Sequence, residues 1–309
     1  MQSKTWALFL MILSILLAGC QLLNPALPTQ PLPPTRTSTV TVPPIPTLTP
    51  WSTKTPTITP TPTNTFTPTP TPPACLKDGG TLVEDTVPTG LLREPVELLV
   101  YLPPCYAETP SAEYPALYLI HGQDFDQQQW ANLGVTALAD EWIGSGEEAP
   151  FLIVMPYVAD WREPPVFPFG QALVEEVIPY IGEHYQAASG RDSRVVGGIS
   201  RGAGWAFHLG LKYWEEFSAF GVHSLPVFFS DAPQVESWLD AIPTGRHPRI
   251  YLDYPEIEQS AIRNSTNFFI NQLEERGIPY TFSTGLGRHD EAYWGAHIED
   301  YLHFYLAGW

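Results

Sequence analysis

The first 74 residues contain no aspartate or glutamate, and their only charged side chains are those of Lys4, Arg36 and Lys54. All 33 acidic residues follow, with the other twelve of the 15 lysines and arginines, so the rest of the chain has a net charge of −21. A surface so short of positive charge repels polyanions. We therefore expect no nucleic-acid partner.

The sequence also lacks the motifs of common metal and cofactor sites. It has no C-x-x-C or H-E-x-x-H, and its histidines are scattered. His289, Asp290 and Glu291 are consecutive, and adjacent residues rarely converge on one ion. No P-loop or dinucleotide-binding glycine motif lies between a strand and a helix. We therefore expect neither a metal ion nor a cofactor.

The N-terminal apolar run is too short to span a bilayer comfortably. It covers residues 6–17 and follows Lys4. Leu17–Cys20 reads LAGC, which is similar to a bacterial lipoprotein signal in which Cys20 becomes the lipidated N-terminus. We expect residues 1–20 to be this signal, with an uncleaved transmembrane anchor as the alternative. Both predict an exported protein that is anchored to a membrane and faces outside the cytoplasm.

Residues 21–74 are rich in proline and threonine. Such a segment has few apolar side chains to bury and many fixed φ angles, so it predicts a disordered, extended spacer. At ~3.1 Å per residue its reach has an upper limit of roughly 150 Å. Residues 75–309 then form one domain, which is large enough for a substantial core.

The cysteine count leaves one pair in this domain. With Cys20 assigned to the lipid, Cys75 and Cys105 remain. An even pair in an exported domain favours a disulfide, here one that brackets the first hairpin. Two buried free thiols are the alternative.

Short apolar runs alternate with longer helical patterns along the domain. The predicted strands are residues 96–102, 116–121, 151–156, 194–199, 220–224, 249–253 and 280–284. The predicted helices are residues 134–143, 171–185, 205–213, 260–277 and 293–308, with Gly277 as a C-cap. This alternation predicts an α/β fold with a mainly parallel central sheet and helices on both faces. Chemistry in such folds lies at the carboxyl ends of the strands.

One serine lies between glycines at such a strand end. Residues 198–202 read GISRG, with a predicted strand before them and a helix after them. This arrangement is typical of a nucleophile elbow, in which small flanking residues permit a tight turn that exposes the hydroxyl of Ser200. The alternative is an ordinary glycine-rich turn.

A serine nucleophile needs a base to accept its proton. His289 lies between the last predicted strand and the last predicted helix, at the carboxyl edge of the sheet, and is our candidate. His121 and His223, at two other strand ends, are predicted to shape loops beside the site. Four further histidines lie within helical patterns, where a surface or core role is expected: His184, His208, His297 and His303.

The base needs an acid to orient it. We choose Glu258, on the segment after residues 249–253, and keep Glu256 and Asp253 as alternatives. Some of these carboxylates could instead cap the helix that begins near Ser260. For the oxyanion, we expect the backbone N–H groups of Gln123 and Arg201 to be the donors.

These residues carry a family resemblance. The segments YPALYLIHG, FLIVMP, GGISRGAGWAF, FGVHS, RIYLD and GRHDEAYWGAHIEDYLHFY follow the order and spacing of the putative-esterase group of α/β hydrolases, which they resemble. That group includes enterochelin-esterase-like proteins, S-formylglutathione hydrolases, feruloyl and acetyl-xylan esterases, and mycolyltransferases. The resemblance covers about residues 80–309.

The resemblance implies a serine esterase with the chain order nucleophile, acid, histidine, which Ser200, Glu258 and His289 fit. The acid segment departs from the family pattern D-x-G-x-x-D, because Pro255 stands at the glycine and Glu258 at the acid. Ala203 likewise replaces the second of a pair of glycines that follows the motif in many members.

We therefore expect a carboxylic-ester hydrolase that acts through an acyl-enzyme and is tethered to the cell surface by its lipid. Its partners would be that membrane and a small-molecule or carbohydrate-linked ester. The alternatives are an acyltransferase to an envelope sugar and a non-enzymatic binding lipoprotein. Four tryptophans near the predicted cleft hint at an aromatic or sugar-bearing substrate, with ordinary core packing as the alternative: Trp130, Trp161, Trp205 and Trp294.

Overall fold

The computed structural model describes residues 73–158 and 160–309. The predicted signal, its Cys20 and the proline- and threonine-rich spacer up to residue 72 lie outside the described residues. Within the described part, no helix combines the length and apolarity needed to cross a membrane.

The described residues form an eight-stranded sheet in the order β1-β2-β4-β3-β5-β6-β7-β8. β1 pairs antiparallel with β2 and β2 antiparallel with β4, and every later pairing is parallel. The strands are β1 (Thr81–Val87), β2 (Val96–Leu102), β3 (Ala116–Ile120), β4 (Leu152–Pro156), β5 (Arg194–Ile199), β6 (Ala219–His223), β7 (Arg249–Ile257) and β8 (Thr281–Arg288). The predicted fold class, a mainly parallel sheet between helices, is confirmed.

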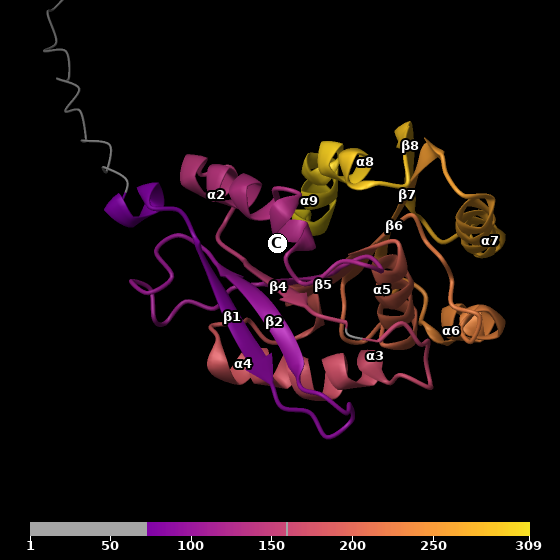
Figure 1. Ribbon diagram of the computed structural model, residues 1–309, viewed down its shortest axis with the longest axis horizontal. Helices are drawn as coiled ribbons and strands as arrows, with labels where there is room; N and C mark the ends of the chain where they lie inside the picture. The colour runs from indigo at the N-terminus through magenta and orange to yellow at the C-terminus, as the bar shows by residue number, and fades with distance from the viewer. Residues whose placement is uncertain (1–72, 159) are drawn as a thin grey trace, which may run out of the picture. The chain divides into compact units, whose positions relative to one another are not determined.

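Helices cover both faces of the sheet, as Figure 1 shows for α2 and α9 on one side and α3 and α4 on the other. One core contains side chains of α3 (Phe169–Ala172), α4 (Ile178–His184), α5 (Arg201–Lys212), α6 (Val235–Ala241) and α7 (Ser260–Arg276). The second core contains side chains of α1 (Gln129–Asn132), α2 (Val135–Ser145), α8 (Glu291–Ala296) and α9 (Ile298–Leu306). The interior strands β3, β4, β5 and β6 are mostly apolar, as expected for strands that are buried on both faces; the exceptions are Arg194 at the start of β5 and His223 at the end of β6.

The structure extends several predicted elements. β7 continues to Ile257 and β8 to Arg288, because the two strands keep pairing beyond the apolar runs that signalled them. The sequence did not predict β1, an edge strand whose side chains are mostly exposed and whose pattern includes Glu84 and Asp85. At the end of α7, Gly277 adopts φ 63° and is the predicted C-cap.

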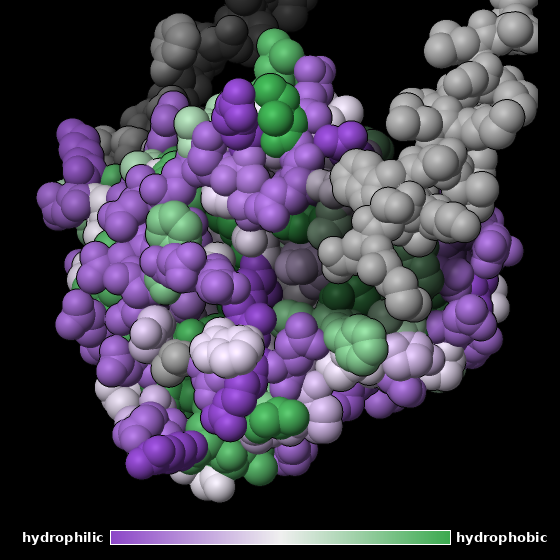
Figure 2. Space-filling model, turned by 45° about the vertical axis from the view of Figure 1, so that its right-hand side comes forward, coloured by the Kyte–Doolittle hydropathy of each residue, from purple (hydrophilic) through white to green (hydrophobic). Residues whose placement is uncertain are grey.

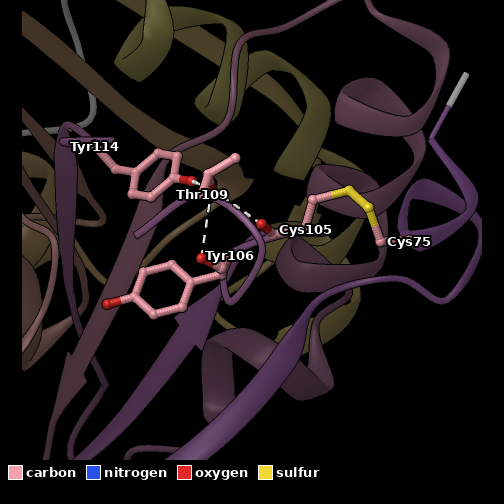
Figure 3. The surroundings of a disulfide bond; sticks show 5 residues. All are labelled: Cys75, Cys105, Tyr106, Thr109 and Tyr114. Carbon is pink, nitrogen blue, oxygen red and sulfur yellow. Dashed lines mark hydrogen bonds between the residues drawn. A yellow bond between two sulfur atoms is a disulfide. The ribbon is translucent and has the colours of Figure 1, made fainter. Parts of the chain in front are cut away.

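The predicted disulfide is present between Cys75 and Cys105, which bracket the β1–β2 hairpin (Figure 3). The segment after Cys105 is held by local contacts. Thr109 Oγ1 donates to the Cys105 carbonyl at 3.0 Å, and the rings of Tyr106 and Tyr114 stack with centroids 5.6 Å apart. The disulfide therefore ties the start of the domain to the segment that follows β2.

The surface is mostly polar on the face that Figure 2 shows. Figure 2 shows hydrophilic side chains over most of one face of the molecule, with hydrophobic side chains in separate small patches. Exposed large apolar side chains include Trp161, Phe229 and Leu286.

Candidate active site

Ser200 occupies a sharp turn between β5 and α5, with φ 52° and ψ −119°. Glycines on both sides are required sterically. A Cβ on Gly198 would lie 2.1 Å from the Gly202 carbonyl oxygen, and a Cβ on Gly202 would lie 2.2 Å from the Ile120 carbonyl oxygen. A non-glycine residue with positive φ is strained and persists only when its surroundings enforce it. The glycine-flanked sequence thus produces the local geometry of a nucleophile elbow.

The structure brings Ser200, His289 and Glu258 together from the ends of β5, β8 and β7. Ser200 Oγ lies 2.9 Å from His289 Nε2, and His289 Nδ1 lies 2.9 Å from Glu258 Oε2. A carboxylate can only accept a hydrogen bond, so Nδ1 carries the proton and donates it. Nε2 is then free to accept from the Ser200 hydroxyl.

The Glu258 side chain is fully buried. Burial opposes its ionisation, but the hydrogen bonds from His289 and from the Gln259 N–H outweigh this effect and hold the pKa of Glu258 below its ordinary value. The Gln259 N–H donates to Oε1 at 2.6 Å. Glu258 is therefore ionised at neutral pH and presents its other oxygen to the histidine.

The two alternative acids lie elsewhere. Asp253 is fully buried and accepts hydrogen bonds from His223 Nδ1 and from the Tyr301 hydroxyl, both at 2.6 Å. Glu256 is exposed on β7. The N-cap residue of α7 is Gln259, and its side chain makes no capping hydrogen bond. Glu258 is not the N-cap residue of α7; one of its carboxylate oxygens accepts from the Gln259 N–H, and the other faces His289.

Helix α8 supports the other side of the imidazole. Trp294 packs edge-on against His289, with ring centroids 4.9 Å apart and an interplanar angle of 82°. Asp290 begins α8 by accepting a hydrogen bond from the Tyr293 N–H at 3.1 Å. The loop that carries His289 is thus held between a packed ring and a capped helix.

A cavity of about 360 Å³ lies beside this turn, between the loops that follow β3 and β4. Its lining includes Gln123, Phe125, Tyr157, Trp161, Arg201 and Trp205. Among the described residues, neither the Gln123 N–H nor the Arg201 N–H donates a hydrogen bond. The two predicted oxyanion donors therefore border one cavity with their N–H groups unused.

His121 links the two loops of this cavity, which agrees with its predicted role in shaping a loop. Its Nε2 accepts from the Val158 N–H at 2.9 Å, so Nδ1 carries the proton and donates to the Gly122 carbonyl at 2.7 Å. Burial lowers the pKa of His121, which keeps the ring neutral. The Gly122 N–H in turn donates to Gln129 Oε1 at 2.8 Å.

The four tryptophans take different places. Trp161 and Trp205 line the cavity, whereas Trp130 is a core residue whose Nε1 donates to the Ile120 carbonyl at 3.1 Å.

The sequence did not point to Tyr157 or to the side chain of Arg201 as cavity lining. The Arg201 guanidinium lies 5.2 Å from the Phe228 ring centroid and donates to the Arg162 carbonyl at 2.6 Å. Position in the sequence could have indicated both lining residues: Tyr157 directly follows β4, and Arg201 directly follows Ser200.

A strained serine at the end of a central parallel strand, with an acid and a histidine from later strand ends, defines the α/β-hydrolase class of serine enzymes. Comparison with known proteins agrees. Residues 90–306 match the family described as "Putative esterase", and the chain belongs to this family.

Among curated proteins, an endo-1,4-beta-xylanase/feruloyl esterase of Xylanibacter ruminicola is 29% identical over 136 residues. That match covers 40% of this chain and only 19% of the relative. Among solved structures, a ferulic acid esterase superposes with a TM-score of 0.65 at 22% identity, over 75% of this chain and 99% of that one. The S-formylglutathione hydrolase of Staphylococcus aureus gives a TM-score of 0.59 at 17% identity, over 74% and 96% of the two chains.

Proposed function

We propose that this domain hydrolyses carboxylic esters through a covalent acyl-enzyme formed on Ser200. The observation that carries the proposal is the hydrogen-bonded chain from Ser200 through His289 to the buried Glu258. A non-enzymatic binding protein would have no need of this alignment or of the strained backbone at Ser200.

The chemistry follows from the geometry. His289 Nε2 takes the proton of the Ser200 hydroxyl as Oγ bonds to the ester carbonyl carbon. Glu258 stabilises the imidazolium that forms, and the N–H groups of Gln123 and Arg201 hold the oxyanion. The imidazolium then gives its proton to the departing alcohol, leaving an acyl-enzyme. A water molecule, deprotonated by His289, releases the carboxylic acid and regenerates Ser200.

The cavity favours an ester with an aromatic or sugar-bearing part. Phe125, Tyr157 and Trp161 supply aromatic surface, and Trp161 is 75% exposed at the rim. Such surfaces bind flat apolar rings and the apolar faces of sugars. The curated relative named above carries feruloyl esterase in its name, which supports testing feruloyl esters first.

Export and lipid anchoring are part of the proposal and rest on the sequence alone. The LAGC segment would direct lipidation of Cys20, and the proline- and threonine-rich residues would hold the esterase away from the membrane. Expression of the intact gene in a bacterium tests this step. A Cys20→Ser chain should lose membrane association, and an unchanged membrane fraction would contradict lipidation.

The catalytic step is tested on the full-length chain with p-nitrophenyl acetate, methyl ferulate and a fluorophosphonate probe. We expect turnover and covalent labelling of Ser200 in the wild type. The Ser200→Ala variant should lose both, with turnover reduced by about 10³-fold or more. A folded Ser200→Ala protein that hydrolyses p-nitrophenyl acetate at the wild-type rate would refute the proposal.

A further inference from the structure

A second histidine–aspartate pair lies in the sheet and takes no part in the proposed reaction. His223, the last residue of β6, faces Asp253 of β7 in register, and both side chains are fully buried. Their hydrogen bond joins Nδ1 to Oδ1 at 2.6 Å. Burying such a pair costs desolvation, and apolar side chains of similar size often replace one without loss of stability. Its presence calls for a role other than stability.

Helix α9 completes the pair from the face of the sheet. The Tyr305 hydroxyl lies 2.7 Å from His223 Nε2, and the Tyr301 hydroxyl donates to Asp253 Oδ2 at 2.6 Å. The rings of Tyr301 and His223 stack with centroids 3.6 Å apart. We call these four residues, His223, Asp253, Tyr301 and Tyr305, the His223 cluster.

The strands beneath Tyr305 are shaped to admit it. A Cβ on Gly197 of β5 would lie 2.0 Å from the Tyr305 hydroxyl oxygen, and a Cβ on Gly221 of β6 would lie 2.4 Å from it. Any larger residue at either position would push the hydroxyl away from His223. The contact is thus built from three elements, β5, β6 and α9.

The backbone of the His223 cluster holds the nucleophile. The Ser200 N–H donates to the His223 carbonyl at 2.7 Å, and the Ser224 N–H donates to the Asp253 carbonyl at 2.8 Å. Both serines have a left-handed backbone, with φ 52° at Ser200 and φ 61° at Ser224. Residues in this region cost energy and revert unless neighbouring contacts over-determine them.

We propose that the His223 cluster is a positioning device for the nucleophile. Its side-chain hydrogen bonds fix the two carbonyl groups that hold Ser200 and Ser224 in their strained conformations. This keeps Ser200 Oγ within reach of His289. The restraint on the backbone of Ser200 and Ser224 does not depend on the proposed esterase function, whereas its effect on turnover does.

Tyr305→Phe is the sharpest test because it removes the hydroxyl from His223 and keeps the ring. We expect kcat for p-nitrophenyl acetate to fall about tenfold with KM changed less than about twofold, since one hydrogen bond is lost and the cavity is untouched. Hydrogen–deuterium exchange of the intact chain should quicken by about tenfold in the peptides that contain Ser200 and Ser224. Tyr280→Phe is the matched control, because the Tyr280 hydroxyl bonds Glu274 at the surface.

Unchanged exchange at Ser200 and Ser224 in a folded Tyr305→Phe protein would overturn the proposal. So would a kcat equal to that of the Tyr280→Phe control. Should Tyr305→Phe not fold, Tyr301→Phe removes the hydrogen bond to Asp253 and is read in the same way. If the wild-type protein had no esterase activity, only the proposed function would be refuted. Faster hydrogen–deuterium exchange at Ser200 in the Tyr305→Phe protein would still support the backbone restraint by the His223 cluster.

Discussion

Glu258 Oε2 lies 2.9 Å from His289 Nδ1, although the family pattern commonly places an aspartate at this position. The longer glutamate side chain reaches the histidine from a buried site beyond β7, and its second oxygen is satisfied by the Gln259 N–H. Ionised and hydrogen-bonded through both oxygens, it can hold the imidazole in the tautomer that the nucleophile needs.

Replacing Glu258 should therefore strongly lower the turnover rate. We expect Glu258→Gln to lower kcat by about 10²–10⁴-fold, because the amide no longer stabilises an imidazolium. Glu258→Asp keeps the charge and is the matched control. It should retain more activity than the glutamine variant. Equal activity of the wild type and Glu258→Gln with p-nitrophenyl acetate would remove Glu258 from the mechanism.

Glu258 should also contribute to the pH dependence of stability. Its pKa is lowered in the folded state from an ordinary value of 4.5, so its contribution is fully present above pH 4.5 and is lost as the pH falls through the folded-state value. Urea unfolding between pH 3 and pH 7 measures this. The Glu258→Gln protein should lose less stability toward low pH than the wild type, and parallel curves for the two proteins would contradict the assignment.

The tight turn at Ser200 predicts that alanine substitutions at two glycines, Gly202 and Gly182, have opposite effects on the free energy of unfolding. Gly202→Ala would place a Cβ 2.2 Å from the Ile120 carbonyl oxygen, and we expect a loss of about 2–4 kcal/mol in the free energy of unfolding. A Cβ on Gly182, within α4, would meet no atom within 4 Å apart from the neighbouring backbone of its own helix, so Gly182→Ala should stabilise by about 0.5–1 kcal/mol. Chemical denaturation distinguishes the two, and similar effects would show that the turn is not tight.

Trp161 should affect substrate choice more than chemistry. Trp161→Ala removes exposed aromatic surface at the cavity rim, so kcat/KM for methyl ferulate should fall about tenfold. The value for p-nitrophenyl acetate should change less than about twofold. Trp161→Phe, which keeps an aromatic ring, should recover part of the loss. A uniform decrease for both esters would argue against a rim contact with the substrate.

The disulfide should stabilise the domain without serving the reaction. Cys75 and Cys105 are 30 residues apart in sequence, and closing such a loop stabilises by roughly 3 kcal/mol. The Cys75→Ser/Cys105→Ser protein should unfold at lower denaturant concentration and keep the wild-type kcat while folded. A large change in kcat would mean that the hairpin positions the site.

Local features were predictable from the sequence because their causes are local. The glycines around Ser200 are dictated by backbone clearances at the turn, and Gly277 ends α7 by its own left-handed conformation. The alternation of apolar runs and helical patterns was enough for the α/β class. The place of His289 followed from its position after a strand, because parallel strands bring their carboxyl ends to one edge.

The choice among the three acids was made only by the tertiary structure. β7 extends past Asp253 and its pairing with β8 shifts register between Pro255 and Ile257, so strand alternation no longer tells which way each side chain points. Asp253 is hydrogen-bonded to His223 and to a tyrosine of α9, Glu256 faces solvent, and Glu258 reaches His289. The sequence by itself determined the fold class and the nucleophile turn, whereas contacts between distant segments decided which carboxylate meets the histidine.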